Sequence, residues 1–135
     1  MGVERISGPV DIAISGLRVQ AMRMNVIATN IANANTTRTA SGQVYRRQDV
    51  QMKSTGGAQG GVTIARVIED QKGEMKKVLM AGHPDADAAG YVQMPNIELP
   101  TEMMHMVSAS RAYQANAAVM KRYQDLMDTT LELLR

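Results

Sequence analysis

The longest feature of the sequence is an unbroken apolar pattern at its C-terminal end. Its positions alternate spacings of four and three residues, as in the seam of a helix that packs along another helix. Pro100 falls in the first turn, where its missing N–H is not needed, and no glycine or proline follows it. At about 1.5 Å per residue, the pattern predicts one helix of roughly 50 Å over residues 99–134. The seam consists of Leu99, Met103, Met106, Ser110, Tyr113, Ala117, Met120, Gln124, Met127, Leu131 and Leu134.

A second apolar pattern lies near the N-terminal end and predicts a helix over residues 10–34. One heptad seam on this helix is formed by Ile14, Leu17, Ala21, Met24, Ala28 and Ile31. A further stripe, on another face, consists of Ile12, Val19 and Val26. Two helices of one chain cannot cover both stripes, so the pattern favours packing against other molecules over a lone helical bundle.

The segment between the helices is irregular and rich in glycine. Short strands are predicted at 44–52 and 62–68, with a hairpin around the glycines of 56–61. A turn is expected at 82–85 and an extended stretch at 91–94, ended by Pro95.

The predicted fold class is therefore mainly α. The N- and C-terminal helices are expected to pack as an antiparallel, coiled-coil-like hairpin, with a short irregular or β middle segment. The expected organisation is an N-terminal helix in 1–35, a middle segment in 36–98 and a C-terminal helix in 99–135. The two ends together would form one structural domain.

The composition fits close-packed helices that meet several different neighbours. Methionine occurs twelve times, whereas phenylalanine and tryptophan are absent. Without large aromatics, burial depends on many smaller side chains, and methionine adapts its shape to irregular partners.

Several classes of function are disfavoured. The net charge is +2 and the basic residues are scattered, so nucleic-acid binding is not expected. There is no cysteine for disulfides or thiolate metal sites. The first residues lack the apolar region of a cleaved secretory signal, and no apolar run is long enough to insert in a membrane.

The sequence offers little for catalysis. His83 and His105 have no metal-binding partner at helical spacing, and Asp85 with Asp87 is more typical of a capped turn than of a cation site. Ser108 and Ser110 have no adjacent base. No catalytic residue, metal ligand or cofactor is predicted.

Asparagines cluster toward the end of the first predicted helix, at positions 25, 30, 33 and 35. One interpretation is a polar helix end that leads into a loop. The other is that their amides form hydrogen bonds across helix interfaces and fix the register, as a buried asparagine does in coiled coils. On the second interpretation, Asn30→Leu leaves the subunit soluble but disturbs ordered assembly.

Two motifs at opposite ends resemble the terminal signatures of bacterial flagellar rod and hook proteins. The N-terminal one comprises Ser15-Gly16-Leu17, Gln20, Arg23-Met24 and Asn30 through Thr36, and the C-terminal one is Ser110-Arg111-Ala112-Tyr113-Gln114-Ala115-Asn116. The segments 37–48 and 90–96 are similar to those of proximal rod subunits of the FlgC type, as is the short length.

This resemblance implies a structural subunit that polymerises by helix packing into the flagellar drive shaft, which spans the periplasm and transmits torque. The implied partners are copies of itself in a helical rod, other rod subunits, the adaptor that joins the rod to the membrane ring, and the flagellar type III export apparatus. Export from the cytoplasm would occur without a cleaved signal peptide. No enzymatic activity is implied.

The assembly interface is predicted to draw on both seams and on the asparagines of the two signatures. The residues are Ile14, Leu17, Ala21, Met24, Asn30, Ile31, Asn33, Met103, Met106, Tyr113, Asn116, Met120, Met127 and Leu131. The alternatives are a soluble helical adaptor, which would be monomeric or dimeric, and another subunit of the flagellar axial family. A cell-wall hydrolase is disfavoured because no acid and base are paired by spacing.

Overall fold

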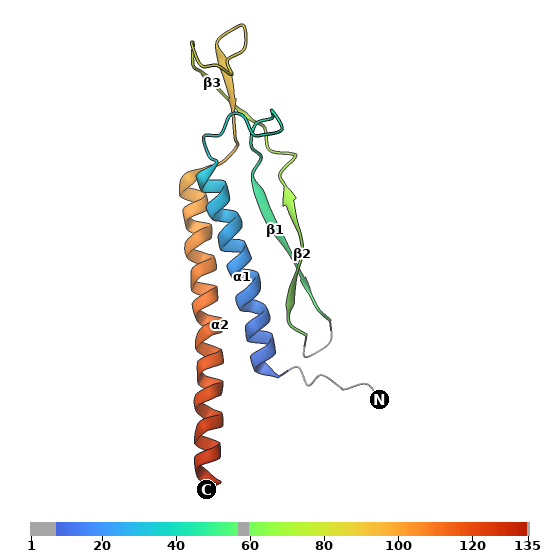
Figure 1. Ribbon diagram of the computed structural model, residues 1–135, viewed down its shortest axis with the longest axis vertical. Coiled ribbons are helices and arrows are strands. Elements are labelled where there is room, and N and C mark those ends of the chain that lie inside the picture. The colour runs from blue at the N-terminus through green and yellow to red at the C-terminus, as the bar shows by residue number, and fades with distance from the viewer. Residues whose placement is uncertain (1–7, 57–59, 135) are drawn as a thin grey trace.

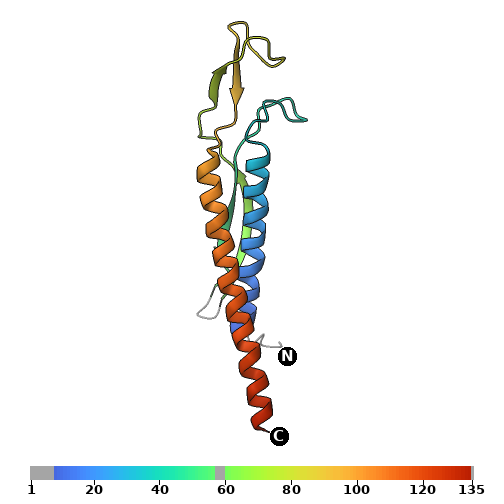
Figure 2. The same cartoon turned by 90° about the vertical axis from the view of Figure 1, so that its left-hand side faces the viewer.

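A computed structural model describes residues 8–56 and 60–134. The chain forms two helices and four strands: α1 (Pro9–Ala32), β1 (Gln48–Ser54), β2 (Val62–Glu69), β3 (Lys76–Leu79), β4 (Tyr91–Met94) and α2 (Leu99–Leu133). The molecule is elongated, with α1 and α2 side by side along its length (Figures 1 and 2). The β1–β2 pair lies along α1, and β3–β4 lies beyond the ends of both helices.

Both predicted helices are confirmed, with ends close to those expected. Each begins with a proline in its first turn, where the residue's fixed φ suits a helix, and each carries one acidic residue there. Asp11 and Glu102 are these residues, and their charge complements the positive end of the helix dipole. α1 ends at Ala32, because Asn33 leaves helical geometry.

The middle segment is more regular than its sequence suggests. β1 and β2 pair antiparallel from Gln48 opposite Glu69 to Ser54 opposite Val62. The predicted hairpin is therefore confirmed, although its first strand begins at Gln48 and not at residue 44. Of the glycine-rich turn, residues 57–59 lie outside the described part of the chain.

A second antiparallel pair, β3–β4, joins Lys76 to Met94 and Leu79 to Tyr91. β4 coincides with the predicted extended stretch, and a turn occupies residues 84–85 as expected. β3 was not predicted from the sequence. It has four residues and begins with two lysines, so the alternation of polar and apolar side chains is too short to predict a strand from the sequence alone.

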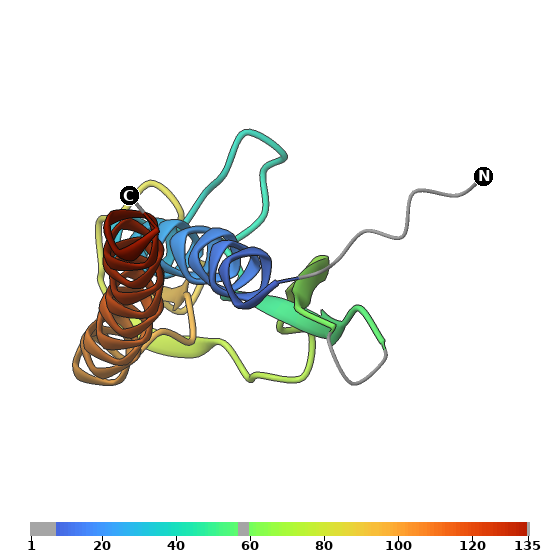
Figure 3. The same ribbon diagram turned by 90° about the horizontal axis from the view of Figure 1, so that it is seen from below.

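The β1–β2 pair changes the interpretation of the second apolar stripe on α1. Val19 is 3% exposed and Val26 is 7% exposed, because the chain's own strands contact this face. Figure 3 shows α1 between α2 and the strand pair. The expectation that this stripe needs a helix from another molecule is therefore wrong for these two valines. Ile12 keeps 38% of its surface exposed.

The core is small and lies where the upper ends of the helices meet the chain that enters and leaves the sheets. Ala34, Tyr45 and Ile97 form one buried cluster. Val92 and Pro95 are also fully buried near the start of α2. Most of the length of α2 contributes little to this core.

Candidate assembly interface

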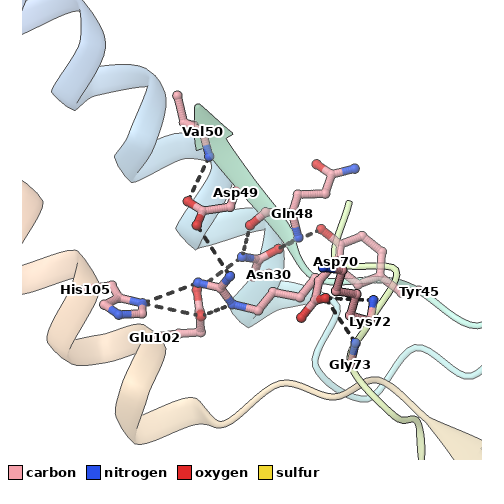
Figure 4. A network of polar contacts seen from close by, with 11 residues as sticks. Asn30, Tyr45, Gln48, Asp49, Val50, Asp70, Lys72, Gly73, Glu102 and His105 are labelled. Carbon is pink, nitrogen blue, oxygen red and sulfur yellow. Dashed lines mark hydrogen bonds and ion pairs between the residues drawn. The ribbon is translucent and has the colours of Figure 1, made fainter. Parts of the chain in front are cut away.

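A buried polar network joins α1, β1 and α2 and is centred on Asn30, which has no exposed surface (Figure 4). The Asn30 side-chain amide donates to the carbonyl of Gln48 at 2.8 Å and to a carboxylate oxygen of Glu102 at 3.1 Å. Its oxygen accepts from the Gln48 N–H at 2.9 Å and from the Tyr45 hydroxyl at 3.0 Å. All four hydrogen-bonding positions of the amide are used. Asn30 thus fixes three elements to one another.

Glu102 brings a negative charge into the same network. Its side chain is almost fully buried, and its Oε1 lies 2.7 Å from Nε of Arg47 and 3.6 Å from Nδ1 of His105. Burial lowers the pKa of Arg47, but the hydrogen bond and charge of Glu102 outweigh this and leave that pKa above its ordinary value. A buried carboxylate is tolerated here because it is paired and hydrogen-bonded.

Tyr45 completes the network from the segment that precedes β1. Burial raises the pKa of its phenol, and the nearby charges of Glu69 and Glu102 raise the pKa further. The phenol therefore stays protonated, and its hydroxyl donates a hydrogen bond to the side-chain oxygen of Asn30.

The two helices also approach closely along their lower halves. A Cβ placed on Gly16 would lie 2.7 Å from Nδ2 of Asn116, so glycine leaves room for this side chain. Ser15 fixes the opposite side of α1, because its hydroxyl accepts from the N–H of Val62 in β2 at 3.0 Å. The structure thus brings residues of the N- and C-terminal signatures into contact.

Asn33 has a local role. Its amide donates to the carbonyl of Thr29 at 2.9 Å, and its oxygen accepts from the hydroxyl of Thr36 at 3.1 Å. These bonds close the C-terminal turn of α1, as in the first interpretation of the asparagine cluster. Asn30, in contrast, bonds to a second helix, as in the other interpretation.

The predicted interface residues differ widely in exposure. The buried residues of α1 are Ala13, Val19, Val26, Ile27 and Asn30, and of these only Asn30 was predicted as an interface residue. Some predicted residues are half-buried: Ile14, Leu17, Ala21, Met24, Ile31, Asn33, Met106, Asn116 and Met120. Others are exposed, namely Met103, Tyr113, Met127 and Leu131. Within the chain, the structure joins Asn30 to α2 and Asn116 to α1 but leaves much of both seams uncovered.

The lower part of α2 extends past the start of α1 (Figures 1 and 2). Every residue from 121 to 134 is exposed, including Leu126 at 67%, Leu131 at 61% and Leu134 at 80%. We call residues 124–134 the overhang. Nothing in the described part of the chain covers its apolar side chains.

An apolar groove lies near the other end of α2. It is an open pocket of about 470 Å³ on one face of α2 and is lined by Pro100, Met103, Met104, Val107, Ser108 and Arg111. The two methionines are exposed by 61% and 68%, and the valine by 51%. We call this surface the methionine groove.

Neither a cluster of three metal-binding side chains nor a helix suited to crossing a membrane occurs among the described residues. No three histidine, aspartate or glutamate side chains among them are grouped so that they could hold a metal ion. Neither helix in residues 8–56 and 60–134 combines the length and hydropathy needed to cross a bilayer.

Several residues of the network escaped the sequence analysis, notably Tyr45, Arg47 and Glu102. The position of Glu102 could have been noticed in the sequence, because it is a carboxylate followed by methionines at the start of the long helix. The close contact at Gly16 also had an indication in the sequence. A glycine inside a helix lowers the stability of that helix, so its presence suggests that close packing requires a small residue there.

Comparison with known proteins agrees with both signatures. A family model for flagella basal body rod proteins matches residues 11–38, and one for the C-terminal part of the flagellar basal body rod FlgEFG proteins matches residues 88–133. The flagellar basal-body rod protein FlgC of Salmonella typhimurium is 46% identical over 126 residues, which cover 91% of this chain and 93% of that protein.

More distant relatives show the same relationship over nearly the whole length. FlgC of Borreliella burgdorferi is 35% identical over 93% of this chain and 95% of its own. FlgC of Bacillus subtilis is 33% identical over 92% of this chain and 95% of its own. With the signatures in contact and relatives that match over at least 91% of it, the chain belongs to the FlgC family of flagellar basal-body rod proteins.

Proposed function

We propose that this structural subunit of the proximal rod polymerises through the uncovered faces of its two helices and carries torque along the resulting shaft. The observation that carries this proposal is the overhang, whose leucines are exposed along a well-formed helix. A helix with apolar side chains in water is typical of a surface that is covered by another molecule. Copies of this chain and other rod subunits are the proposed neighbours.

We further propose that α1 and α2 act as one antiparallel, coiled-coil-like pair. Two contacts support this arrangement: Asn30 meets Glu102 near the top, and Gly16 meets Asn116 lower down. The distance along the sequence from Gly16 to Asn30 equals that from Glu102 to Asn116, so one regular register runs between the helices.

The polar network would make this pair stiff under load. Sliding of α2 along α1 would break the bonds of Asn30 to Glu102 and of Glu102 to Arg47 together. Because the carboxylate is buried, it would then lack partners, which is costly. The network thus opposes shear between the two helices, which is the motion that torque would impose on them.

The remaining proposed partners come from the resemblance and the family. They are the adaptor that joins the rod to the membrane ring, and the export apparatus that carries the chain out of the cytoplasm without a cleaved signal. The β3–β4 pair lies beyond the helix ends, where it could contact the next layer of subunits (Figure 1). We propose a structural role for the whole chain, with no enzymatic step.

The direct test is whether the protein co-purifies with intact basal bodies. A strain that lacks its own copy is supplied with the tagged chain, and basal bodies are isolated after membrane solubilisation. We expect the tag in the rod fraction together with recovery of swimming. A tagged chain that is found only in the soluble fraction, as a monomer or dimer, would favour the adaptor alternative.

A further inference from the structure

The overhang and the methionine groove lie at opposite ends of α2, and each is an apolar surface without a cover among the described residues (Figures 1 and 2). We propose that the overhang of one copy docks in the methionine groove of the next copy, so that subunits join head to tail. This inference rests on the proposed function, because it names the neighbour and the contact through which the rod subunit would assemble.

The overhang continues a surface that already serves as an interface. Ala109 and Asn116 lie on the side of α2 that faces α1. Met127 and Leu134 follow on the same side, since they lie 11 and 18 residues after Asn116, which is close to three and five turns of the helix. The register of Gly16 with Asn116 places Pro9, the first residue of α1, level with Tyr123. From residue 124 onward, α2 therefore continues the face that packs on α1, but no residue of α1 lies beside it.

The lengths of the two surfaces agree. The overhang comprises residues 124–134, and the groove runs along α2 from Pro100 to Arg111. At about 1.5 Å per residue, both are roughly 16 Å long. A second copy, displaced along the long axis until its lower end lies beside this groove, would cover both surfaces at once.

The charges are also complementary. Asp125, Asp128 and Glu132 are exposed and follow one another at spacings of three and four, so they form an acidic flank beside the apolar face. The groove carries the exposed cation Arg111. Leucines on methionines would supply the apolar part of the contact, and methionine adapts to the shape of its partner.

A contact of this type uses different surfaces on the two partners. It is heterologous, so each added copy leaves one new groove or one new overhang free, and the assembly propagates. A symmetric pairing of overhang with overhang would instead close as a dimer and stop.

Cross-linking of the purified full chain tests this contact. Because the sequence has no cysteine, each introduced thiol is the only one in its chain. Differently tagged Met104→Cys and Leu131→Cys proteins are mixed and oxidised. A parallel sample uses Met127→Cys in place of Leu131→Cys, in case the second copy docks about one helical turn away from the expected position. Ala118→Cys is the control partner, because it is also exposed and lies about 21 Å from Met104 along α2. Circular dichroism confirms that all variants keep the same helix content.

We expect disulfide-linked heterodimers from groove and overhang thiols in several-fold excess over the control pairing. Arg111→Glu should weaken self-association in sedimentation by about two- to fivefold, and Asp128→Arg in the same chain should restore it. Equal cross-linking of the control, or absence of rescue by the charge swap, would overturn the contact.

These outcomes are separate from the test of the proposed function. A chain that enters basal bodies but gives no specific cross-link is a rod subunit with a different contact. A chain that cross-links as expected but stays out of basal bodies keeps the contact and loses the proposed function.

Discussion

At the scale of single residues, Asn30 shows how a helix seam becomes specific. Apolar side chains alone would tolerate several alignments of the two helices, since a shift by one heptad places similar side chains opposite one another. The amide of Asn30 reaches Glu102, Gln48 and Tyr45 together in one alignment only. The sequence indicated that an asparagine here would fix register, but the partners come from segments 15 to 72 residues away.

Replacement of Asn30 is expected to affect the fold as well as assembly. Asn30→Leu leaves the buried hydroxyl of Tyr45 and the N–H of Gln48 without a partner. The free energy of unfolding should fall by about 2–4 kcal/mol in urea denaturation. Asn25→Leu is the matched control at an exposed position of the same helix and should change this energy by less than about 0.5 kcal/mol. Equal effects of the two substitutions would argue against the network.

Tyr45 gives the network a pH dependence on the alkaline side. Its pKa in the folded chain is above the ordinary value of 10.0, so the unfolded chain releases this proton first as the pH rises. The contribution to stability is therefore complete below pH 10 and is lost as the pH rises through the raised pKa. The pKa of Arg47 is raised as well, so its ion pair with Glu102 persists across this window.

The free energy of unfolding should thus decrease as the pH rises above 10, and it should decrease less in Tyr45→Phe. That variant also loses one hydrogen bond, so the comparison is of slopes against pH and not of absolute stability. Tyr123→Phe, on the exposed end of α2, is the control and should keep the slope of the parent chain. Parallel slopes in all three proteins would contradict the assignment to Tyr45.

At the scale of elements, the helices were predictable and the contacts between them were not. A period of three and four residues over 35 residues leaves no other regular structure, so α2 was expected almost to the residue. The face of α2 that meets α1 was predicted less well, because the contacts involve glycine and asparagine, which a search for apolar seam residues does not detect. The β1–β2 pair could be expected from its sequence, but not its place beside α1, where the N–H of Val62 donates to the hydroxyl of Ser15.

The close approach at Gly16 can be measured by a double-mutant cycle. Alanine favours a helix by up to about 1 kcal/mol over glycine, but a Cβ at Gly16 would displace the side chain of Asn116. Gly16→Ala should therefore stabilise the Asn116→Ala chain by about 0.5–1 kcal/mol and stabilise the parent chain by clearly less. Chemical denaturation of the four proteins gives the coupling. Identical effects in both backgrounds would mean that Gly16 is not kept small by Asn116.

At the scale of the whole molecule, the chain has a small core and a long uncovered helix. Its own strands cover one stripe of α1, which reduces the number of surfaces that need a partner. Large apolar side chains stay exposed at both ends of α2, and others are exposed along its middle, on α1 and on the strands. The sequence indicated that the chain packs against other molecules, and the two ends of α2 are the parts of this surface that the proposed contact uses.

Removal of residues 121–134 should separate folding from assembly. Because every residue in this segment is exposed, its loss removes few intramolecular contacts, and the thermal midpoint should change by less than about 4 °C. The shortened chain should nevertheless fail to restore swimming or to appear in basal bodies. The control is a full-length chain in which exposed Thr129 and Thr130 are changed to alanine, which keeps the apolar face. Normal rods from the shortened chain would refute the role of the overhang.

The one-sided position of the overhang has a consequence for how such a polymer grows. Only one end of α2 extends beyond α1, so the subunit has a direction (Figure 1). Every copy joined through the proposed contact would point the same way. The two tips of the filament are then chemically unlike: one displays bare C-terminal helices and the other displays empty grooves. If subunits join in this way, the two tips would add subunits at different rates, and a protein that fits one tip would stop growth there and leave the other tip free.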